Sequence, residues 1–499
     1  MKHTLVTIGI IATLGCQPVP VHRERALNQR PQSPSQTAAN TQEVPRPWTR
    51  DQSTLTNDVD DNLPRVLELE AIEGACQDYR NGDHSEQTRL RCGKWMFFYE
   101  SFGTVGIPSH LLEFFQHWYQ PYFGSSFSSM GFVPNPNSND SIPIGLAEST
   151  QRMGSIKIHA FTCASCHFGQ MPDGRYAVGY PNHQLDYGRF FASMVALMKL
   201  SINRNEDSIH PLLRAALGET VQSARQRNGC MMGLGRLGLN IATRGGDAMT
   251  SGVLDLTHEE QLRFWHLRTG TMDFLTKPMA DDGVWTVSRI LSLWNLPTPE
   301  RIEEAGMPHG LLSWTGIGKS LMDFLHGFVA ISGSNSEWTD EQLQPLADYI
   351  YSLRAPAAVH EANHEAVERG AETFAQAGCL ECHDGPSGEG RELYDFDDIG
   401  TDPAMKTIYN PDDDGQLCCG LDAAGDQATW SLKSPRLAGQ RFRTRLLHNG
   451  SLDNLEQLLC LEPRPDRHSE AESAIGHRFG CDELSESEKL DLIDYINHL

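Results

Sequence analysis

The sequence predicts a mainly α-helical protein built from two similar units, the first enlarged by long, loop-rich helical insertions. Three observations lead to this prediction. A Cys-x-x-Cys-His motif occurs twice, as CASCH at residues 163–167 and CLECH at 379–383. Two similar helix-forming segments follow the motifs, at 338–356 and 484–499. No convincing run of alternating strand residues separates them.

Residues 1–16 predict a secretory signal, because a basic start precedes an apolar run that ends at Gly15 and Cys16. The run is too short to span a bilayer. Its end resembles a bacterial lipoprotein cleavage site with Cys16 as the lipidated residue, although Thr13 stands where Leu is usual and leaves ordinary cleavage open. We therefore expect a protein of the periplasm or cell envelope, attached to the membrane only through an N-terminal lipid anchor.

Residues 17–60 are rich in Pro, Gln, Ser, Thr and Asn and predict a disordered tether. No later stretch is apolar enough to predict a membrane helix. The 499 residues carry 41 Lys plus Arg against 65 Asp plus Glu, a formal charge of -24. This charge argues against a nucleic-acid partner and favours a cationic one.

The two similar segments each predict a closing helix. Each has a Ser/Thr start followed by acidic residues, apolar residues at helical spacing, a Tyr-Ile pair and a final Leu. Pro356 and the polar stretch behind it mark a boundary, which predicts domains at 61–356 and 360–499. In the second domain, a predicted helix runs directly into the motif at 379–383.

The first domain is longer than one such unit needs. Its extra length lies between the first motif and the first closing helix, with predicted helices near 188–200, 210–228 and 259–275 and many Gly and Pro loops. Without a run of alternating strands, we expect this insertion to be mainly helical.

The Cys-x-x-Cys-His spacing is the one that attaches haem c, because two thiols one helical turn apart form thioethers and the next His reaches the iron. The cofactor-binding thiols would be those of Cys163, Cys166, Cys379 and Cys382, and the proximal iron ligands His167 and His383. A structural zinc site is the alternative. The two pairs lie too far apart for a zinc ribbon, and export into an oxidising compartment disfavours it further.

Of the twelve cysteines, seven remain besides Cys16 and the motif cysteines. They are Cys76, Cys92, Cys230, Cys418, Cys419, Cys460 and Cys481. The first two and the last two are each close in sequence and predict disulfides that close modest loops. The adjacent pair in the middle could bridge itself, or one member could meet Cys230.

The chain resembles the di-haem cytochrome c peroxidase superfamily, which includes the methylamine dehydrogenase maturation enzyme, and within it most the di-haem rubber-oxygenase branch. The resemblance extends from about residue 140 to 499. It is carried by IPIGL at 142–146, GTDP at 400–403, KSPRLAGQRFRTRLLHNGSLDNLEQLL at 433–459 and GHRFG at 476–480. It implies two cytochrome-c-like domains with one haem each.

The resemblance also implies roles for three further residues. His477 would be the distal ligand of the second haem, His448 would lie near the inter-domain haem region as a catalytic residue, and Trp294 would stand near or between the haems. The usual peroxidase branch supplies a Met shortly after the LHNGS helix, but this chain has none there, so His448 and His468 compete with His477 as ligand. A plain core residue is the other interpretation of Trp294.

The resemblance leaves the sixth position of the first haem open, with His159, His183 and His309 as possible distal residues. It implies a haem-dependent oxidoreductase that activates peroxide or dioxygen at the first haem and relays electrons through the second. A small redox protein such as a soluble cytochrome, or an unknown organic substrate, would be the partner. The alternative is a non-catalytic periplasmic electron-transfer cytochrome, although the large first domain favours an enzyme.

Peroxidase relatives often bind Ca²⁺ between their domains. The acidic stretches near 395–403 and 410–415 are where this chain would hold it. Neither has the ligand spacing of a known calcium loop, and a solvated acidic surface is the other interpretation.

Overall fold

The computed structural model describes residues 58–104, 106–109, 112, 126–138, 142–153, 156–186, 190, 271–273, 287–304, 312–314, 320–331, 334–357, 363–385, 387–401, 431–465 and 473–499. The predicted signal, most of the tether and the predicted helices near 188–200 and 210–228 lie almost entirely outside these residues. So do Cys16, Cys230, Cys418, Cys419, His309, His468 and the acidic stretch at 410–415.

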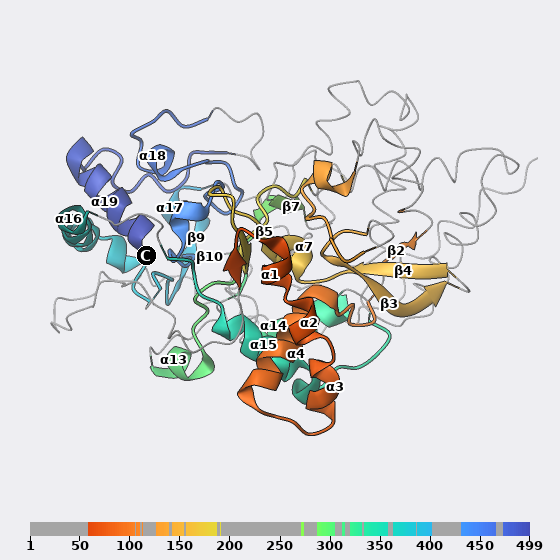
Figure 1. The fold of residues 1–499 in the computed structure, drawn as a ribbon. Helices are drawn as coiled ribbons and strands as arrows, with labels where there is room; N and C mark the ends of the chain where they lie inside the picture. The colour runs from red at the N-terminus through yellow and green to blue at the C-terminus, as the bar shows by residue number, and fades with distance from the viewer. Residues whose placement is uncertain are drawn as a thin grey trace, which may run out of the picture.

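The first unit is built around two long helices that pack against each other. Its helices are α1 (Leu63–Leu67), α2 (Leu69–Ile72), α3 (Ala75–Arg80), α4 (Glu86–Tyr99), α7 (Ala164–His167), α13 (Pro299–Glu304), α14 (Leu321–Ile331) and α15 (Asp340–Ser352), with a 3₁₀ turn η2 (Phe127–Met130). The predicted closing helix is confirmed as α15, which begins in a capping box between Thr339 and Gln342. α15 packs along α4 (Figure 1).

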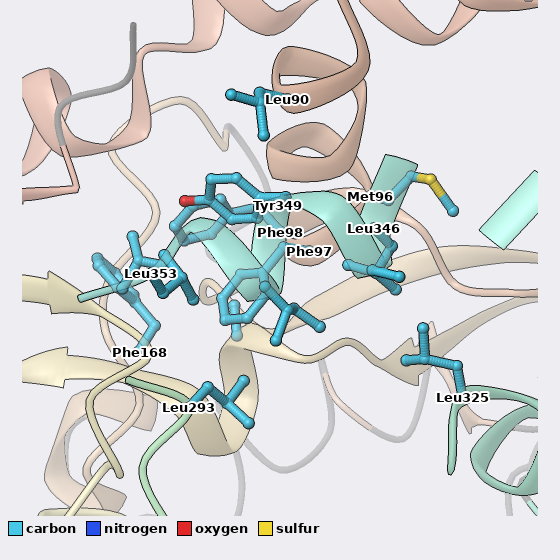
Figure 2. Close-up of a cluster of buried hydrophobic side chains, with 14 of the residues drawn as sticks. Leu90, Met96, Phe97, Phe98, Phe168, Leu293, Leu325, Leu346, Tyr349 and Leu353 are labelled. Atoms are coloured by element: carbon cyan, nitrogen blue, oxygen red, sulfur yellow. The ribbon is translucent and has the colours of Figure 1, made fainter. Parts of the chain in front are cut away.

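The contact between α4 and α15 depends on Gly93. A side-chain carbon at this position would overlap the backbone carbonyl of Pro345. The rings of Phe97 and Tyr349 then meet edge to face, with centroids 5.9 Å apart. Figure 2 shows these two rings beside Phe98 in the core between the helices. Gly93, four residues before Phe97, therefore allows the backbone of α15 to lie close to that of α4.

The second unit repeats this arrangement. Its helices are α16 (His364–Gln376), α17 (Phe396–Ile399), α18 (Leu455–Leu458) and α19 (Glu486–His498), with 3₁₀ turns η4 (Cys379–Glu381) and η7 (Gln440–Phe442) and the strand pair β9 (Leu393–Asp395) and β10 (Ser431–Lys433). The second closing helix is confirmed as α19, with a capping box between Ser485 and Glu488. α19 lies beside α16 (Figure 1).

Gly370 takes the place in the second unit that Gly93 has in the first. A side-chain carbon there would overlap the backbone carbonyl of Asp491 in α19. Four residues later, Phe374 meets Tyr495 with ring centroids 5.3 Å apart. The order of first helix, Cys-x-x-Cys-His motif and closing helix is therefore common to both units, together with the packing of their glycine and aromatic residues.

The described residues are mainly helical with few strands, as the sequence predicts, but short sheets surround the first motif, where no run of alternating residues predicted them. They are β2 (Ile107–Pro108), β4 (Ile156–Phe161) and β3 (Leu146–Met153) in that order; β1 (Val59–Asp60), β6 (Tyr176–Val178) and β5 (Phe168–Gln170); and the pair β7 (Thr271–Asp273) and β8 (Val287–Arg289). All pair antiparallel, and the β2-β4-β3 sheet lies at the right of Figure 1. In β4, Lys157 is exposed but Ile158, His159 and Ala160 are all buried, so burial does not alternate along this strand and gives no period-two signal.

Two further expectations are corrected. The helix expected over 259–275 is wrong at β7, where pairing with β8 determines the backbone. Residues 58–60, at the end of the predicted tether, instead belong to the fold, because β1 pairs with β6 and Asp58 is buried. The Asp58 carboxylate accepts a 2.7 Å hydrogen bond from Tyr349 and lies 3.4 Å from Nζ of the buried Lys94. A buried ammonium requires such counter-charges, which brings this end of the chain into the fold.

Both predicted disulfides are confirmed. Cys76–Cys92 joins α3 to α4, and Cys460–Cys481 joins the end of the α18 segment to the residues before α19. None of the helices in the described ranges is long and apolar enough to cross a membrane.

Candidate functional site

The first motif forms the single turn α7 between β4 and β5. The backbone N–H of His167 donates to the carbonyl of Cys163 at 3.0 Å, which closes the turn and places both thiols on one side. Burial lowers the pKa of His167 to about 4; the backbone of Leu291 partly opposes this shift and Arg436 adds to it. The imidazole is therefore neutral at neutral pH, as a metal ligand must be.

The second motif follows α16 directly through η4. Nδ1 of His383 donates to the carbonyl of Gly388 at 2.6 Å, since a carbonyl can only accept. This bond determines the tautomer and leaves the lone pair of Nε2 available to a metal. Burial lowers the pKa of His383 and keeps the ring neutral.

His477 faces His383 across the second site. Their ring centroids lie 6.4 Å apart at an interplanar angle of 63°. Two imidazoles that bind one metal ion from opposite sides, through bonds of about 2 Å, have centroids about 6 Å apart. Burial, and then the nearby His383, lower the pKa of His477 to about 4. The pair therefore fits a metal ion held between two neutral imidazoles.

The GHRFG motif has a local physical reason. A side-chain carbon at Gly476 would overlap the side chain of Thr401, so only glycine allows this approach. His477 itself has a φ of 54°, a left-handed conformation that costs a residue other than glycine about 1–2 kcal/mol. Its N–H donates to the carbonyl of Ile399 at 3.1 Å. The loop is thus held in an unfavourable conformation that directs the imidazole inward.

The motif cysteines differ from the others in the described ranges. Those at 76, 92, 460 and 481 form disulfides, whereas Cys163, Cys166, Cys379 and Cys382 remain free thiols. Burial raises the pKa of the first two to about 12 and that of the third to about 11, and it also raises the pKa of the fourth. Free thiols at these four positions are what thioether attachment of a haem requires.

These donor sets fit haem c. In the described part of the chain, no group of three or more His, Cys, Asp or Glu residues could hold a metal ion. Two imidazoles alone suit an iron that brings its own ring of nitrogen ligands. The second haem would be held by the thiols at 379 and 382 and by His383 and His477, and the first by the thiols at 163 and 166 and by His167.

His448 lies in the LHNGS loop between the two units. Its ring packs against Trp314, with centroids 6.3 Å apart, and against Phe396 at 5.9 Å. Its Nδ1 is 3.4 Å from the hydroxyl of Thr401, the residue that contacts Gly476. The backbone carbonyl of His448 accepts a 2.7 Å hydrogen bond from the N–H at position 289 in β8. His448 therefore connects the first unit to the loop that carries His477.

Trp294 is completely buried where the two units meet. Its Nε1 donates to the carbonyl of Val178 at 2.7 Å, and its ring lies between Tyr180 and Phe442, at centroid distances of 5.8 and 6.1 Å. The next residue after Val178, Gly179, donates its N–H to the carbonyl of His167 at 2.8 Å. Trp294 thus packs against segments that belong to both units and is connected to the first motif by two hydrogen bonds through the peptide between Val178 and Gly179.

The structure distinguishes the possible distal residues of the first site. The backbone N–H of Thr444 donates to Nδ1 of His183 at 3.0 Å, so the proton of this neutral ring is on Nε2. Neither nitrogen of His183 is then available to a metal. His159 lies in β4, with Nδ1 3.2 Å from the hydroxyl of Ser109. Among the described residues, no second imidazole faces His167 as His477 faces His383.

A cluster of buried basic residues, not predicted from the sequence, lies where the two units meet. Its members are Arg289, Lys433, Arg436 and Arg443, all at most 6% exposed. Burial lowers the pKa of Lys433 to about 7 and that of Arg289 to about 9. Three of the four line a small pocket together with Leu291, Ser292 and Trp314. The five basic residues between 433 and 445, immediately before LHNGS, were the available signal.

The acidic stretch near 395 forms α17, and Asp395 accepts a 3.0 Å hydrogen bond from Ser431. Binding of Ca²⁺ by this acidic stretch remains a prediction.

No protein-family model and no curated protein matches the chain. Among solved structures, hydrazine synthase of Kuenenia stuttgartiensis, pressurised with 20 bar xenon, aligns over 47% of this chain and 77% of that chain. The identity is 18% and the TM-score 0.26. A similarity at this level does not establish a common fold.

Proposed function

We propose that the chain is an exported di-haem c-type cytochrome with two cytochrome-c-like domains and that it acts as a haem-dependent oxidoreductase. His383 and His477 would hold the second haem, which would supply one-electron transfer. His167 would hold the first haem, where peroxide or dioxygen would be activated. Haem iron supplies one-electron chemistry and, where a coordination position is open, a binding site for the oxidant.

The observation that carries the proposal is the pairing of two half-buried, neutral imidazoles whose centroids are 6.4 Å apart, one of which directly follows a Cys-x-x-Cys pair. Two strong axial ligands saturate an iron and suit it to electron transfer. The repeated packing at Gly93 and Gly370 supports two related domains.

The assignment of catalysis to the first haem rests on the family resemblance and on the contrast between the two sites. Only the second site pairs two imidazoles within the described residues. Trp294 packs against both units and would lie on the route of electrons between the haems. A net charge of -24 suits a cationic redox partner, such as a small soluble cytochrome, as electron donor.

Absorption and EPR spectra of the purified protein, as isolated and half-reduced, test the proposal. We expect one low-spin haem with two His ligands and one high-spin haem that changes its spectrum with peroxide, dioxygen, carbon monoxide or cyanide. Two low-spin haems and no response to any of these molecules, in either state, would instead support the electron-transfer cytochrome.

The ligand assignment has its own test. His477→Ala should convert the second haem from low-spin to high-spin or water-ligated, while His448→Ala should leave its low-spin signal intact. Loss of that signal only in the His448 variant would show that the ligand is misassigned.

A further inference from the structure

Arg464 lies behind the loop that carries His477, and all five of its N–H groups donate to backbone carbonyls. Nε donates to Gln457 at 3.1 Å; one terminal nitrogen donates to Ala474 at 2.9 Å and Gly476 at 2.7 Å, and the other to Leu458 at 2.7 Å and His477 at 2.9 Å. A guanidinium has five N–H donors in a rigid planar fork. Its donors are thus fully used by two segments of the chain, the end of α18 and the ligand loop.

Other contacts also hold the ligand loop: the His477 N–H on the carbonyl of Ile399, the close approach of Gly476 to Thr401, and a 2.9 Å hydrogen bond from the Asn449 side chain to the carbonyl of Ser473. The side chains of Ile475 and Phe479 are exposed to 63% and 51% and add little apolar burial. His477 has a left-handed backbone that the loop would not adopt by itself. The Arg464 bond to the His477 carbonyl acts on the same residue whose imidazole faces His383.

The disulfide Cys460–Cys481 links the same two parts of the chain, and Sγ of Cys481 lies 3.7 Å from a terminal nitrogen of Arg464. It fixes the two ends of a loop whose half-cystines are 21 residues apart in sequence. Arg464 is within that span and ties residues 474, 476 and 477 directly to the end of α18. The disulfide therefore closes the loop, and Arg464 determines its conformation.

We propose that Arg464 is the positioning residue for the distal ligand: it holds the carbonyls of Gly476 and His477 so that the imidazole stays opposite His383. This inference rests on the proposed function, because it takes His477 as the ligand of the second haem. It assigns to Arg464 the stability of the six-coordinate state, with no part in electron transfer itself.

The test uses the full-length, haem-loaded protein with Arg464→Gln, Arg464→Lys and the control Arg478→Gln. Arg478 is adjacent to His477, but its side chain is 57% exposed and lies 3.8 Å from Asp482. The readouts are the low-spin EPR signal of the second haem and the rate at which cyanide binds to it. Haem content and urea unfolding are measured alongside.

Arg464→Gln should raise the cyanide rate at the second haem by about tenfold or more, since several charge-assisted hydrogen bonds are lost. Part of the low-spin signal should become high-spin, and added imidazole should restore it. Arg464→Lys, with three donors, should fall between Gln and wild type. If Arg464→Gln loses its second haem, the low-spin EPR signal and the cyanide-binding rate of Arg464→Lys test the proposal instead.

A wild-type spectrum and cyanide rate in both Arg464 variants, or an equal change in Arg478→Gln, would overturn the inference. Failure of the proposed function is distinguished by His477→Ala. If that variant keeps the low-spin signal, His477 is not the ligand and the positioning role falls with it. If it loses the signal while the Arg464 variants do not, only the positioning role is wrong.

Discussion

Substitution of Gly370 by Ala should destabilise the second unit, because the added carbon would lie 2.7 Å from Cβ of Tyr495 and 2.6 Å from the carbonyl carbon of Asp491. Ordinary contacts begin at 3.4 Å, so the carbonyl carbon alone would require α16 and α19 to move apart by about 0.8 Å, and the carbonyl oxygen of Asp491, which lies closer still, would require more. Overpacking of this kind costs about 1–3 kcal/mol, and the obstacle is backbone, which favours the upper end. The higher helix propensity of Ala compared with Gly offsets about 1 kcal/mol of this loss in stability. The expected net loss is about 2 kcal/mol.

Urea unfolding of the haem-loaded protein, followed by circular dichroism and by the haem absorption band, measures this loss. With a slope of about 2 kcal/mol per molar urea, the midpoint should fall by about 1 M. Glu372→Ala, at an exposed position of the same helix, is the control and should change little. Because Gly93 makes the equivalent contact in the first unit, Gly93→Ala should lose a similar amount. A Gly370→Ala midpoint equal to or above wild type would refute the close-approach argument.

Three further predictions concern the haems and the start of the fold. Cys163→Ala or Cys379→Ala should leave one haem per chain in a pyridine haemochrome assay, because each attachment uses its own thiols; two haems in either variant would contradict this. Lys94→Met should cost about 3–5 kcal/mol in urea unfolding, because Asp58 loses its buried partner, and an unchanged midpoint would count against this ion pair. Trp294→Phe should preserve both haem spectra but slow electron exchange between the haems after half-reduction; an unchanged rate would leave Trp294 a packing residue.

The sequence by itself determined what depends on local spacing. Two thiols and a His within five residues predict a haem-attachment turn, and a Ser or Thr cap before a helical period predicts a closing helix. The disulfides were predictable for a similar reason, since half-cystines near in sequence close short loops. The two motifs lie at 163–167 and 379–383, and the two closing helices at 338–356 and 484–499. The disulfides join the cysteines at 76 and 92 and those at 460 and 481.

The strands around the first motif escaped prediction because they are short and their partners are remote. β1 pairs with β6 although more than a hundred residues separate them, and β7 became a strand only through β8. Alternation over three or four residues is too weak a signal when pairing with a distant segment determines the backbone.

Only the tertiary structure decided which histidine faces His383. The chain has 20 histidines, and the family resemblance favoured His477 without any local spacing that required it. Its position depends on contacts between distant segments: Gly476 against Thr401, the His477 N–H on Ile399, and Arg464 on the loop carbonyls. The first is a steric fit between remote residues and the other two end on backbone carbonyls that every residue carries, so they leave no pattern in the sequence and arise only when the chain is folded.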